Sequence, residues 1–391
     1  MTLEFEYSTL ANSEDVKRFG KILEQCFIGT PADENIYINK IGVENFRVLH
    51  QQGQVVGGLA HLPMAQWWGN QKVPMTGIAA VGVAPEYRGT GAAITLMRQT
   101  VQELYAKDVP ISVLFPATQR LYRKAGYEQG GAFCSWEIPA KSIQLSEQPL
   151  PLVTVSFELE LFNDIYQQQA KLNNGNLDRY KAIWQRIIEP DEKEATYTYA
   201  IGSADYPQGY IIFSQHSTEN DTILRIKDWV ILTAAAARTF WSFMSNHRSQ
   251  IDKVRWRGST IDALTLLLPE QTAKIRSTNY WMLRVLNVVK ALEKRGYPLS
   301  VEAELHLEIQ DDLLAENNGK FILSVANGRG EVTSGGKGEL QLDIRGLAPL
   351  YTGLFTPLQL QLAGKLDATE TALFAATQIF TGASPWMPDF F

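Results

Sequence analysis

An apolar segment, residues 78–84, is followed by a turn that contains Arg88, Gly89 and Gly91 and then by a helical pattern. This order predicts a buried strand that ends, turns tightly and leads into the start of a helix. The first amides of such a helix have no partners within it, and the helix dipole adds partial positive charge. The glycines let the backbone approach an anion closely, and the arginine adds a fork of donors. We therefore expect this turn to bind a phosphate group.

Tyr122 is the second residue whose type suggests chemistry. It lies in a helical segment predicted for residues 118–125, which Thr118 could cap and Gly126 closes. The ordinary pKa of a tyrosine, about 10, keeps the hydroxyl protonated at neutral pH, so that it can donate a proton to a leaving group. The alternative is a packing role, which is common for tyrosines on amphipathic helices.

Composition and spacing narrow the class of protein. The chain has 391 residues, enough for two or three domains, and a net charge of -6, which argues weakly against a nucleic-acid partner and is compatible with a cationic substrate. The histidines and the two cysteines, Cys26 and Cys134, lack the spacing of metal ligands, so we expect no metal. No segment has the apolar length of a membrane helix and the N-terminus lacks a signal-peptide pattern, so we expect a cytoplasmic protein.

The elements that position these residues follow from hydrophobic periodicity and turn signals. Residues 1–140 predict the order β-α-β-β-β-α-β-α-β, a mixed α/β domain. Its predicted elements are a strand at 3–9, a helix from about 13 to 27, a hairpin at 46–50 and 54–64, the strand and helix around residues 78–93, a strand at 111–115, a helix at 118–125 and a strand at 133–138.

Two sequence markers carry a resemblance to a known superfamily. The strand order and the turn resemble the GCN5-related N-acetyltransferase (GNAT) superfamily, whose signature Arg/Gln-x-x-Gly-x-Gly/Ala is matched by Arg88, Gly91 and Ala93. The second marker, Tyr-x-x-x-Gly-Phe/Tyr, is matched by Tyr122, Gly126 and Tyr127. Both markers occur in the expected order and on the expected elements.

A second α/β pattern follows a linker at about residues 141–150. It comprises a hairpin-like pair at 195–201 and 209–214, strands at 223–232 and 254–257, and a helix at 233–251. The turn Ile231–Ala237 contains no glycine and no arginine, so we interpret this pattern as a degenerate GNAT-like copy that does not bind coenzyme.

The last part of the chain predicts a strand meander with helices. A helix is expected at about 282–295, strands at 304–309, 320–326 and 339–344, turns at 317–319 and 327–328, and helices at 345–352 and 368–380. This pattern is similar to the sterol-carrier-protein fold.

The three-part order and the aromatic C-terminus resemble the enhanced intracellular survival (Eis) family. The resemblance implies a catalytic GNAT domain at 1–145, a degenerate GNAT-like domain at 146–285 and a sterol-carrier-protein-like domain at 286–391. It also implies acetyl-coenzyme A as co-substrate, a hexamer, and transfer of an acetyl group to a primary amine of an aminoglycoside or polyamine-like molecule. The alternatives are a lysine acetyltransferase acting on proteins and a non-catalytic acyl-coenzyme A or lipid-binding protein.

The resemblance also assigns roles to residues. The coenzyme would contact the backbone of Val81 and Val83 and the set Arg88, Gly89, Thr90, Gly91, Ala92, Ala93 and Thr118. The Val83 amide would stabilise the oxyanion and Tyr122 would act as general acid. The C-terminal carboxylate, here that of Phe391, would be the base, with a water-mediated base or a tail that only packs on its own domain as alternatives. Cys26, Phe27 and Ala80 are expected to line the acceptor pocket.

Overall fold

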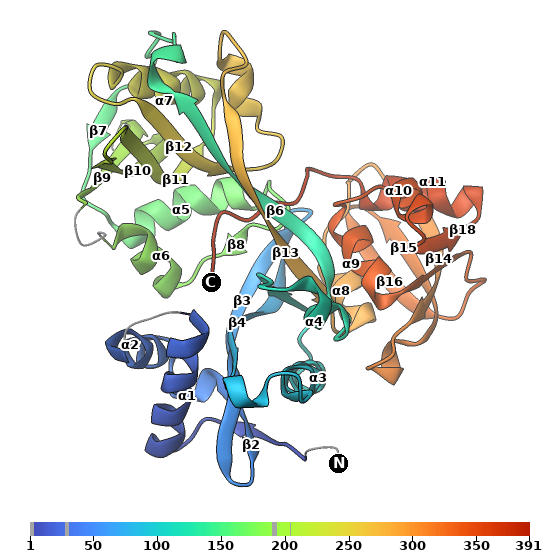
Figure 1. Cartoon of the computed structure of the whole chain (residues 1–391). Helices are drawn as coiled ribbons and strands as arrows, with labels where there is room; N and C mark the ends of the chain where they lie inside the picture. Colours follow the sequence, from blue (N-terminus) through green and yellow to red (C-terminus); the bar gives the residue numbers. More distant parts are fainter. Residues whose placement is uncertain (1–3, 28–30, 190–193, 204) are drawn as a thin grey trace. The chain divides into compact units, whose positions relative to one another are not determined.

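The computed structural model describes residues 4–27, 31–189, 194–203 and 205–391 (Figure 1). Two compact units are present, and each is described by itself. The first unit comprises residues 1–130, 281–382 and 391, and the second comprises residues 131–280 and 383–390.

The first unit contains a mixed sheet with the strand order β1-β2-β3-β4-β5-β13. Its elements are β1 (Glu6–Thr9), α1 (Ser13–Phe27), α2 (Pro31–Ile41), β2 (Phe46–Gln51), β3 (Gln54–Trp68), β4 (Gln71–Val83), α3 (Ala92–Ala106), β5 (Ile111–Leu114), α4 (Gln119–Arg123) and the start of β6 (Glu128–Pro139). The order predicted from the sequence is therefore confirmed, apart from α2, which the prediction missed. At the β2–β3 turn both Gln52 and Gly53 have positive φ, 50° and 77°, as a tight two-residue hairpin requires.

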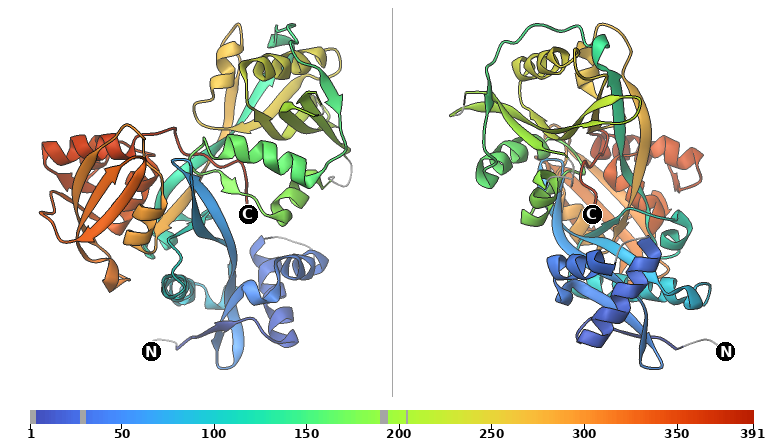
Figure 2. Two further views of the ribbon diagram at one scale, coloured as in Figure 1. Left: turned by 180° about the vertical axis from the view of Figure 1, so that it is seen from behind. Right: turned by 60° about the vertical axis from the view of Figure 1, so that its left-hand side comes forward.

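Helices cover both faces of the β3–β4 part of this sheet. Leu96, Met97 and Val101 of α3 are buried in one apolar cluster, whereas Phe19 and Leu23 of α1 belong to another. Figures 1 and 2 show α1 and α3 on opposite faces of the two strands. The strand β4 therefore lies between two separate apolar layers.

The second unit repeats this design, with the strand order β6-β12-β11-β10-β9-β7. Its elements are β7 (Leu152–Thr154), α5 (Leu159–Ala170), β8 (Leu177–Asp178), α6 (Lys181–Ile188), β9 (Thr196–Gly202), β10 (Pro207–Ser217), β11 (Thr222–Ile231), α7 (Ala234–Asn246) and β12 (Lys253–Gly258). The helix α7 joins the parallel strands β11 and β12, as α3 joins β4 and β5. The predicted helix at 233–251 ends at Asn246, five residues early, and α5 and α6 were not predicted.

Each of these two sheets is completed by a strand from elsewhere in the sequence. The end of β13 (Lys274–Val285) follows the second α/β pattern in the chain but pairs antiparallel with β5 in the first unit. In turn, β6, which follows the first pattern, pairs antiparallel with β12 in the second unit. The two last strands are thus exchanged.

The helix predicted at 282–295 is wrong in its first part. Residues 282–285 are strand, and the helix is only α8 (Val288–Lys294), which begins where the Asn287 side chain accepts a hydrogen bond from the Lys290 amide at 3.0 Å. The segment Trp281–Leu286 is apolar except for Arg284. Its pattern fits a buried strand as well as a helix, and pairing with β5 decides between them.

A five-stranded sheet in the order β16-β15-β14-β17-β18 forms the C-terminal part of the first unit. Its elements are β14 (Ala303–Gln310), β15 (Gly319–Ala326), β16 (Arg329–Ser334), β17 (Leu340–Asp343), α9 (Ile344–Thr352), α10 (Pro357–Leu362), β18 (Leu366–Ala368) and α11 (Glu370–Phe380). The predicted strands and both predicted helices are present, and Asn327 and Gly328 form a turn with φ of 53° and 74°. The strands β16 and β18 and the helix α10 were not predicted.

Candidate active site

The strands β4 and β5 separate at one end of the first sheet. Their parallel pairing runs from Met75 and Ile111 to Ile78 and Leu114, where β5 ends, while β4 continues to Val83. Among the described residues no strand takes the place of β5 beside the last five residues of β4. The backbone donors and acceptors on that edge are therefore available to a ligand.

A bulge lies in this open part of β4. The register between β3 and β4 shifts between Gly58 and Ala60, and Ala80 has a φ of 52°, a value that non-glycine residues rarely adopt. Beyond it, the amide of Ala84 donates to the carbonyl of Val56 on β3, at 2.9 Å. Because backbone groups alternate in direction along a strand, the amide of Val83 points the other way, to the side where β5 has ended.

The turn after β4 leaves the start of α3 open. Gly89 and Gly91 have φ values of 80° and 95°, and a Cβ added to either would meet no atom within 4 Å. Gly91 occupies the N-cap position, and no side chain caps the helix there. Arg88, Gly89, Thr90 and Gly91 are exposed, so the unpaired first amides of α3 and one guanidinium lie together at the surface.

The matching turn of the second unit is closed. The side chain of Thr233 accepts a hydrogen bond from the Ala236 amide at 3.1 Å and so caps α7. The same hydroxyl donates to Gln208 at 2.7 Å. Because a side chain already occupies one of the free helix amides, this turn is a poorer anion site than the turn at Gly91.

Tyr122 lies on α4 in the same apolar cluster as Val83 and Ala92. Burial raises the pKa of Tyr122 to about 12. Among the described residues its hydroxyl has no hydrogen-bond partner, whereas the hydroxyl of Tyr127 donates to Ser112 at 2.8 Å. Thr118 occupies the N-cap position of α4, but its side chain makes no capping hydrogen bond. Tyr122 thus brings an unoccupied donor to the α3 side of β4.

Residues expected at the acceptor pocket lie on the other side of β4. The sulfur of Cys26 is 3.6 Å from the carbonyl oxygen of Val83 and 3.7 Å from Nη2 of Arg88. Cys26 and Ala80 pack against the α1 cluster, whereas Phe27 is 54% exposed. The structure therefore brings Cys26 and Ala80 to one layer and leaves the Phe27 side chain facing solvent.

The C-terminal residue packs on this second layer of the first unit. The ring of Phe391 contacts Phe115 edge-on, with ring centroids 5.7 Å apart, and packs against the α1 cluster. A Cβ added to Gly77 of β4 would lie 2.6 Å from Cε2 of this ring. Only a glycine permits so close an approach, so β4 has a seat shaped for the last side chain of the chain.

The residues before Phe391 are held in the second unit by a buried ion network. Arg179 donates to Asp389 at 3.0 and 3.1 Å and to Asp228 at 2.6 and 2.8 Å, and Tyr210 donates to Asp228 at 2.6 Å. The guanidinium of Arg179 also stacks over the ring of Tyr166, 3.8 Å from its centroid. Burial raises the pKa of Asp389, although Arg179 opposes this effect. The residues before Phe391 are therefore held by a buried carboxylate, Asp389, whose charge would be unfavourable without Arg179.

A polar network beneath α3 was not predicted. Glu103 accepts hydrogen bonds from Arg47 at 2.7 Å and from Tyr7 at 2.6 Å, and Nε2 of His61 lies 3.5 Å from the Thr100 hydroxyl. Burial lowers the pKa of His61 to about 4. Burial alone would raise the pKa of Glu103, but its hydrogen bonds, that of Arg47 foremost, lower it to about 2. The sequence signal that could have indicated this network is the presence of two polar residues, Thr100 and Glu103, near the buried face of the predicted helix.

The comparisons with known proteins agree on the class of enzyme in which this strand, bulge and turn occur. Models of the acetyltransferase (GNAT) domain match residues 8–130 and 175–285, and a model of the sterol carrier protein domain matches residues 288–388. A solved GCN5-related N-acetyltransferase from Anabaena variabilis is 64% identical, with a TM-score of 0.97 over 99% of this chain and 100% of that one.

More distant relatives include further N-acetyltransferases. An uncharacterized N-acetyltransferase of Streptomyces griseus is 27% identical over 89% of this chain and 86% of its own. The N-acetyltransferase Eis of Mycobacterium tuberculosis is 23% identical over 78% of this chain and 77% of its own. Eis1 from Mycobacterium abscessus shares the fold, with a TM-score of 0.83 at 20% identity over 99% of this chain and 100% of that one.

The chain belongs to the GCN5-related N-acetyltransferase family and has the Eis-like order of two GNAT domains and a sterol-carrier-protein domain. It is an N-acetyltransferase, and enzymes of this family take the acetyl group from acetyl-coenzyme A. In the described part of the chain, no group of three or more His, Cys, Asp or Glu could hold a metal ion. Nor does any helix described here combine the length and apolarity needed to cross a membrane.

Proposed function

We propose that the first α/β domain transfers an acetyl group from acetyl-coenzyme A directly to a primary amine of a small molecule. The observation that supports this most is that one apolar cluster contains Val83 at the open edge of β4, Ala92 at the uncapped start of α3, and Tyr122. On this proposal residues 1–145 are catalytic, residues 146–285 form a degenerate copy that binds no coenzyme, and residues 286–391 form the C-terminal domain.

The coenzyme would bind along the α3 side of β4. Its pyrophosphate would accept hydrogen bonds from the free amides at residues 89–93 and from Arg88, where helix dipole and guanidinium both favour an anion. Its pantetheine arm, which carries amides, would pair with the backbone of Val81 and Val83 as an added strand would. The exposed glycines and the unpaired strand edge support this arrangement.

The reaction is an attack of the amine nitrogen on the thioester carbonyl carbon. A C–N bond forms, the carbonyl oxygen becomes an oxyanion, and the Val83 amide would donate a hydrogen bond to it. The C–S bond then breaks, and Tyr122 would donate to the departing sulfur. The amine loses one proton to a base, so that an amide and the free thiol of coenzyme A are the products.

For the base we propose the C-terminal carboxylate of Phe391. The seat over Gly77 and the contact with Phe115 support a fixed position for this residue in the first unit. A water-mediated base is the alternative, because an amine needs little help to lose a proton once its nitrogen is bonded to carbon. A tail that only packs would show the same ring contacts, so the carboxylate itself has to be tested.

The acceptor is proposed to be an aminoglycoside or a polyamine-like molecule that meets β4 on the side of Cys26 and Ala80, with Phe27 nearby. Two rivals are a lysine acetyltransferase acting on proteins and an acyl-coenzyme A or lipid-binding protein without catalysis. The second rival needs an apolar cavity in the C-terminal domain. A pocket of about 310 Å³ has apolar walls from this domain, but Lys365 and two residues of the first domain, Arg123 and Glu128, also line it, so it offers charged walls to a lipid.

An acceptor screen with acetyl-coenzyme A tests the proposal. Thiol release would be followed with aminoglycosides, polyamines and lysine peptides, and the acetylated amine would be located by mass spectrometry. Arg88→Gln is expected to raise the KM for acetyl-coenzyme A about tenfold, as loss of a charge-assisted hydrogen bond does. Arg98→Gln, on the exposed side of the same helix, is the matched control. Coenzyme binding without release to any acceptor would favour the binding protein instead.

The hexamer rests on the Eis resemblance alone, whereas the location and the excluded partners follow the expectations from the sequence. We propose a cytoplasmic homo-hexamer that has no nucleic-acid or membrane partner. Sedimentation velocity of the full chain would check the oligomeric state, and a monomer at micromolar concentration would contradict it.

A further inference from the structure

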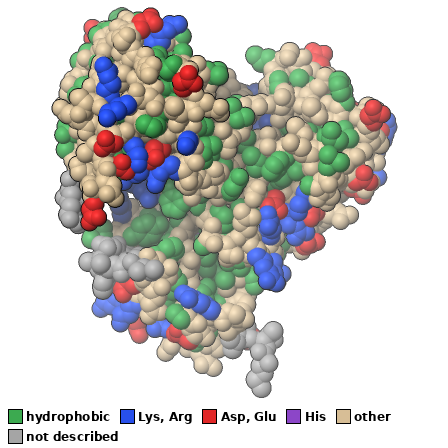
Figure 3. All heavy atoms as spheres, turned by 45° about the horizontal axis from the view of Figure 1, so that its top comes forward, with side chains coloured by type: hydrophobic (Ala, Val, Ile, Leu, Met, Phe, Trp, Pro, Cys, Tyr) green, Lys and Arg blue, Asp and Glu red, His purple; other side chains and the backbone are tan. Residues whose placement is uncertain are grey.

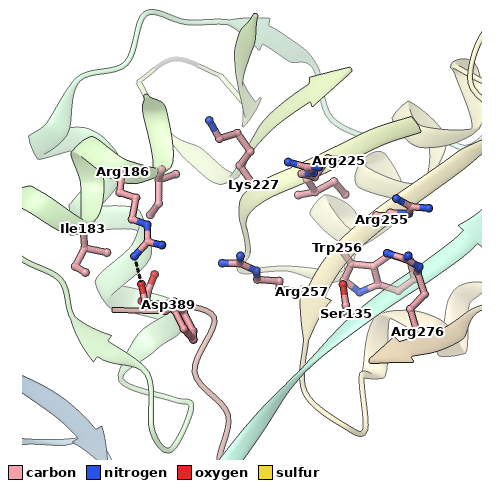
Figure 4. A pocket seen from close by; sticks show the side chains of 13 residues that line it. Ser135, Ile183, Arg186, Arg225, Lys227, Arg255, Trp256, Arg257, Arg276 and Asp389 are labelled. Carbon is pink, nitrogen blue, oxygen red and sulfur yellow. Dashed lines mark hydrogen bonds between the residues drawn. The ribbon is translucent and has the colours of Figure 1, made fainter. Parts of the chain in front are cut away.

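A cavity of about 370 Å³ lies in the second unit, outside the proposed active site. Its walls come from α6, from strands β6, β11, β12 and β13, and from Asp389 and Phe390 of the C-terminal tail. They carry six cationic side chains: Arg186, Arg225, Lys227, Arg255, Arg257 and Arg276. Figure 3 shows lysine and arginine side chains gathered at one place on this part of the molecule, and Figure 4 shows Arg257 between Arg186 on one side and Arg255 on the other.

The cations share one face of the sheet because they alternate along two strands. On β11, Arg225 and Lys227 are two residues apart, and on β12, Arg255 and Arg257 are two residues apart. Side chains two residues apart lie on the same face, whereas Leu224 and residues like it face the core. Arg225 and Arg255 are direct partners in the β11–β12 register. Like charges opposite each other destabilise a sheet unless other groups compensate them.

Carboxylates neutralise only part of this charge. Arg255 and Arg276 share one carboxylate, that of Glu137, at 2.7 and 3.3 Å. The aspartate of the cavity wall, Asp389, is already engaged by Arg179. Neither Arg186 nor Arg257 forms an ion pair with another described residue.

The tail contributes backbone acceptors to the two unpaired arginines. Arg186 donates to the carbonyl of Phe390 at 2.6 Å, and Arg257 donates to the carbonyl of Pro388 at 3.0 Å. These bonds leave most of each guanidinium fork unused. The Arg257 side chain keeps an exposed surface toward the cavity, yet the protein around it displaces enough water to lower its pKa, an effect that the nearby Arg186 strengthens. An anion in the cavity would relieve both the desolvation and the repulsion.

We propose that this cavity binds a small polyanion with at least two phosphate or carboxylate groups. Arginine forks match the planar edges of carboxylates and the oxygens of phosphates. Arg186 and Arg257, which form no ion pair with another described residue, carry two charges, and a single monovalent anion would balance only one of them. The volume is at the lower end of the range for ligand pockets, which suits a compact molecule rather than a polymer. The site is separate from the coenzyme turn and does not depend on the proposed acetyl transfer.

Calorimetric titration of the full chain with inorganic pyrophosphate and with citrate tests the proposal. Both are expected to bind at least about tenfold more tightly than inorganic phosphate at the same ionic strength. Arg257→Gln should weaken pyrophosphate at least about tenfold, and Arg257→Lys by less, because the charge remains but the fork is lost. Arg238→Gln, which removes an arginine of α7 that pairs with Glu147, is the matched control and should bind normally.

Two further variants keep the result interpretable. Arg276→Gln, whose side chain is 45% exposed, should also weaken binding and should keep the fold even where Arg257→Gln disturbs it. Arg88→Gln distinguishes the cavity from the coenzyme turn, because pyrophosphate bound at the turn would respond to Arg88 and not to Arg257. The proposal is overturned if pyrophosphate and citrate do not bind, if Arg238→Gln weakens them equally, or if only Arg88→Gln has an effect.

Discussion

Replacing Tyr122 by phenylalanine is the sharpest test of the proposed chemistry. The change removes a hydroxyl that has no partner among the described residues and leaves the ring in its contact with Tyr127, at a centroid distance of 6.3 Å. We therefore expect the free energy of unfolding to change by less than about 1 kcal/mol. The variant should fold and should bind acetyl-coenzyme A with nearly the same affinity.

The loss of turnover can be estimated from the pKa of Tyr122. Its value of about 12 lies above the roughly 8.5 of an ordinary thiol, so complete proton transfer to the thiolate would be uphill by about 5 kcal/mol. The hydroxyl therefore acts mainly as a hydrogen-bond donor to the developing thiolate. General acids contribute about 10² to 10⁴ in rate, and we expect the lower end, about a hundredfold or about 3 kcal/mol in the barrier.

Initial rates of thiol release at saturating acceptor, over a range of acetyl-coenzyme A concentrations, separate kcat from KM. Tyr127→Phe is the control: it loses the bond to Ser112 and should lower stability by about 1 to 2 kcal/mol while keeping kcat. The high pKa also predicts that the wild-type rate shows no loss from Tyr122 ionisation between pH 6 and 9. A Tyr122→Phe enzyme with turnover within twofold of wild type would refute the assignment.

Gly91→Ala should raise the KM for acetyl-coenzyme A about five- to thirtyfold, because an alanine at a φ of 95° adds about 1–2 kcal/mol of strain at the turn; steady-state kinetics check this, and an unchanged KM would count against the site. Adding two glycines after Phe391 moves the carboxylate and should lower kcat at least about tenfold near pH 7, an effect that a water-mediated base would not show. Gly77→Ala should have a similar effect, since its Cβ would fall 2.6 Å from the Phe391 ring, and limited proteolysis of the tail would report the displacement. Burial lowers the pKa of His61 from about 6.5 to about 4, so between these pH values the unfolded chain binds a proton that the folded chain does not. The free energy of unfolding should therefore fall by about 3 kcal/mol as the pH drops through this range. Urea unfolding at several pH values should show a smaller fall for His61→Gln, and an unaltered pH dependence would contradict the prediction.

Local signals account for what the sequence predicted well. The turn at Gly89 and Gly91 and the hairpin at Gln52 and Gly53 depend on residues next to each other, and each carries its own conformational requirement. The strand–helix–strand order of the first domain follows from periodicity within short segments. For the same reason Tyr122 could be placed on its helix before its surroundings were known.

Long-range pairing accounts for what was missed. The sequence pattern predicted a helix at residues 282–285, where the structure has a strand, because the partner strand β5 is far away in the chain. The cationic cavity was not predicted because its residues come from α6 and from separate strands, two cations at a time, and only the folded sheet sets Arg225 beside Arg255. The seat for Phe391 was missed for the same reason, because it depends on Gly77, which is far from Phe391 in the sequence and lies against its ring in the fold.

The exchange of the last strands has a consequence for how the chain is made. During synthesis one edge of β5 stays unpaired until β13 has been made, because Ile111 pairs with Val285. Until then this edge can pair with another nascent chain, a known route to aggregation. A gene fragment that stops after the first acetyltransferase motif would leave the same edge bare, and its remaining strand β6 would lack β12. We therefore expect the first α/β domain by itself to aggregate, and a shortened enzyme to need a replacement for β13 to stay in solution.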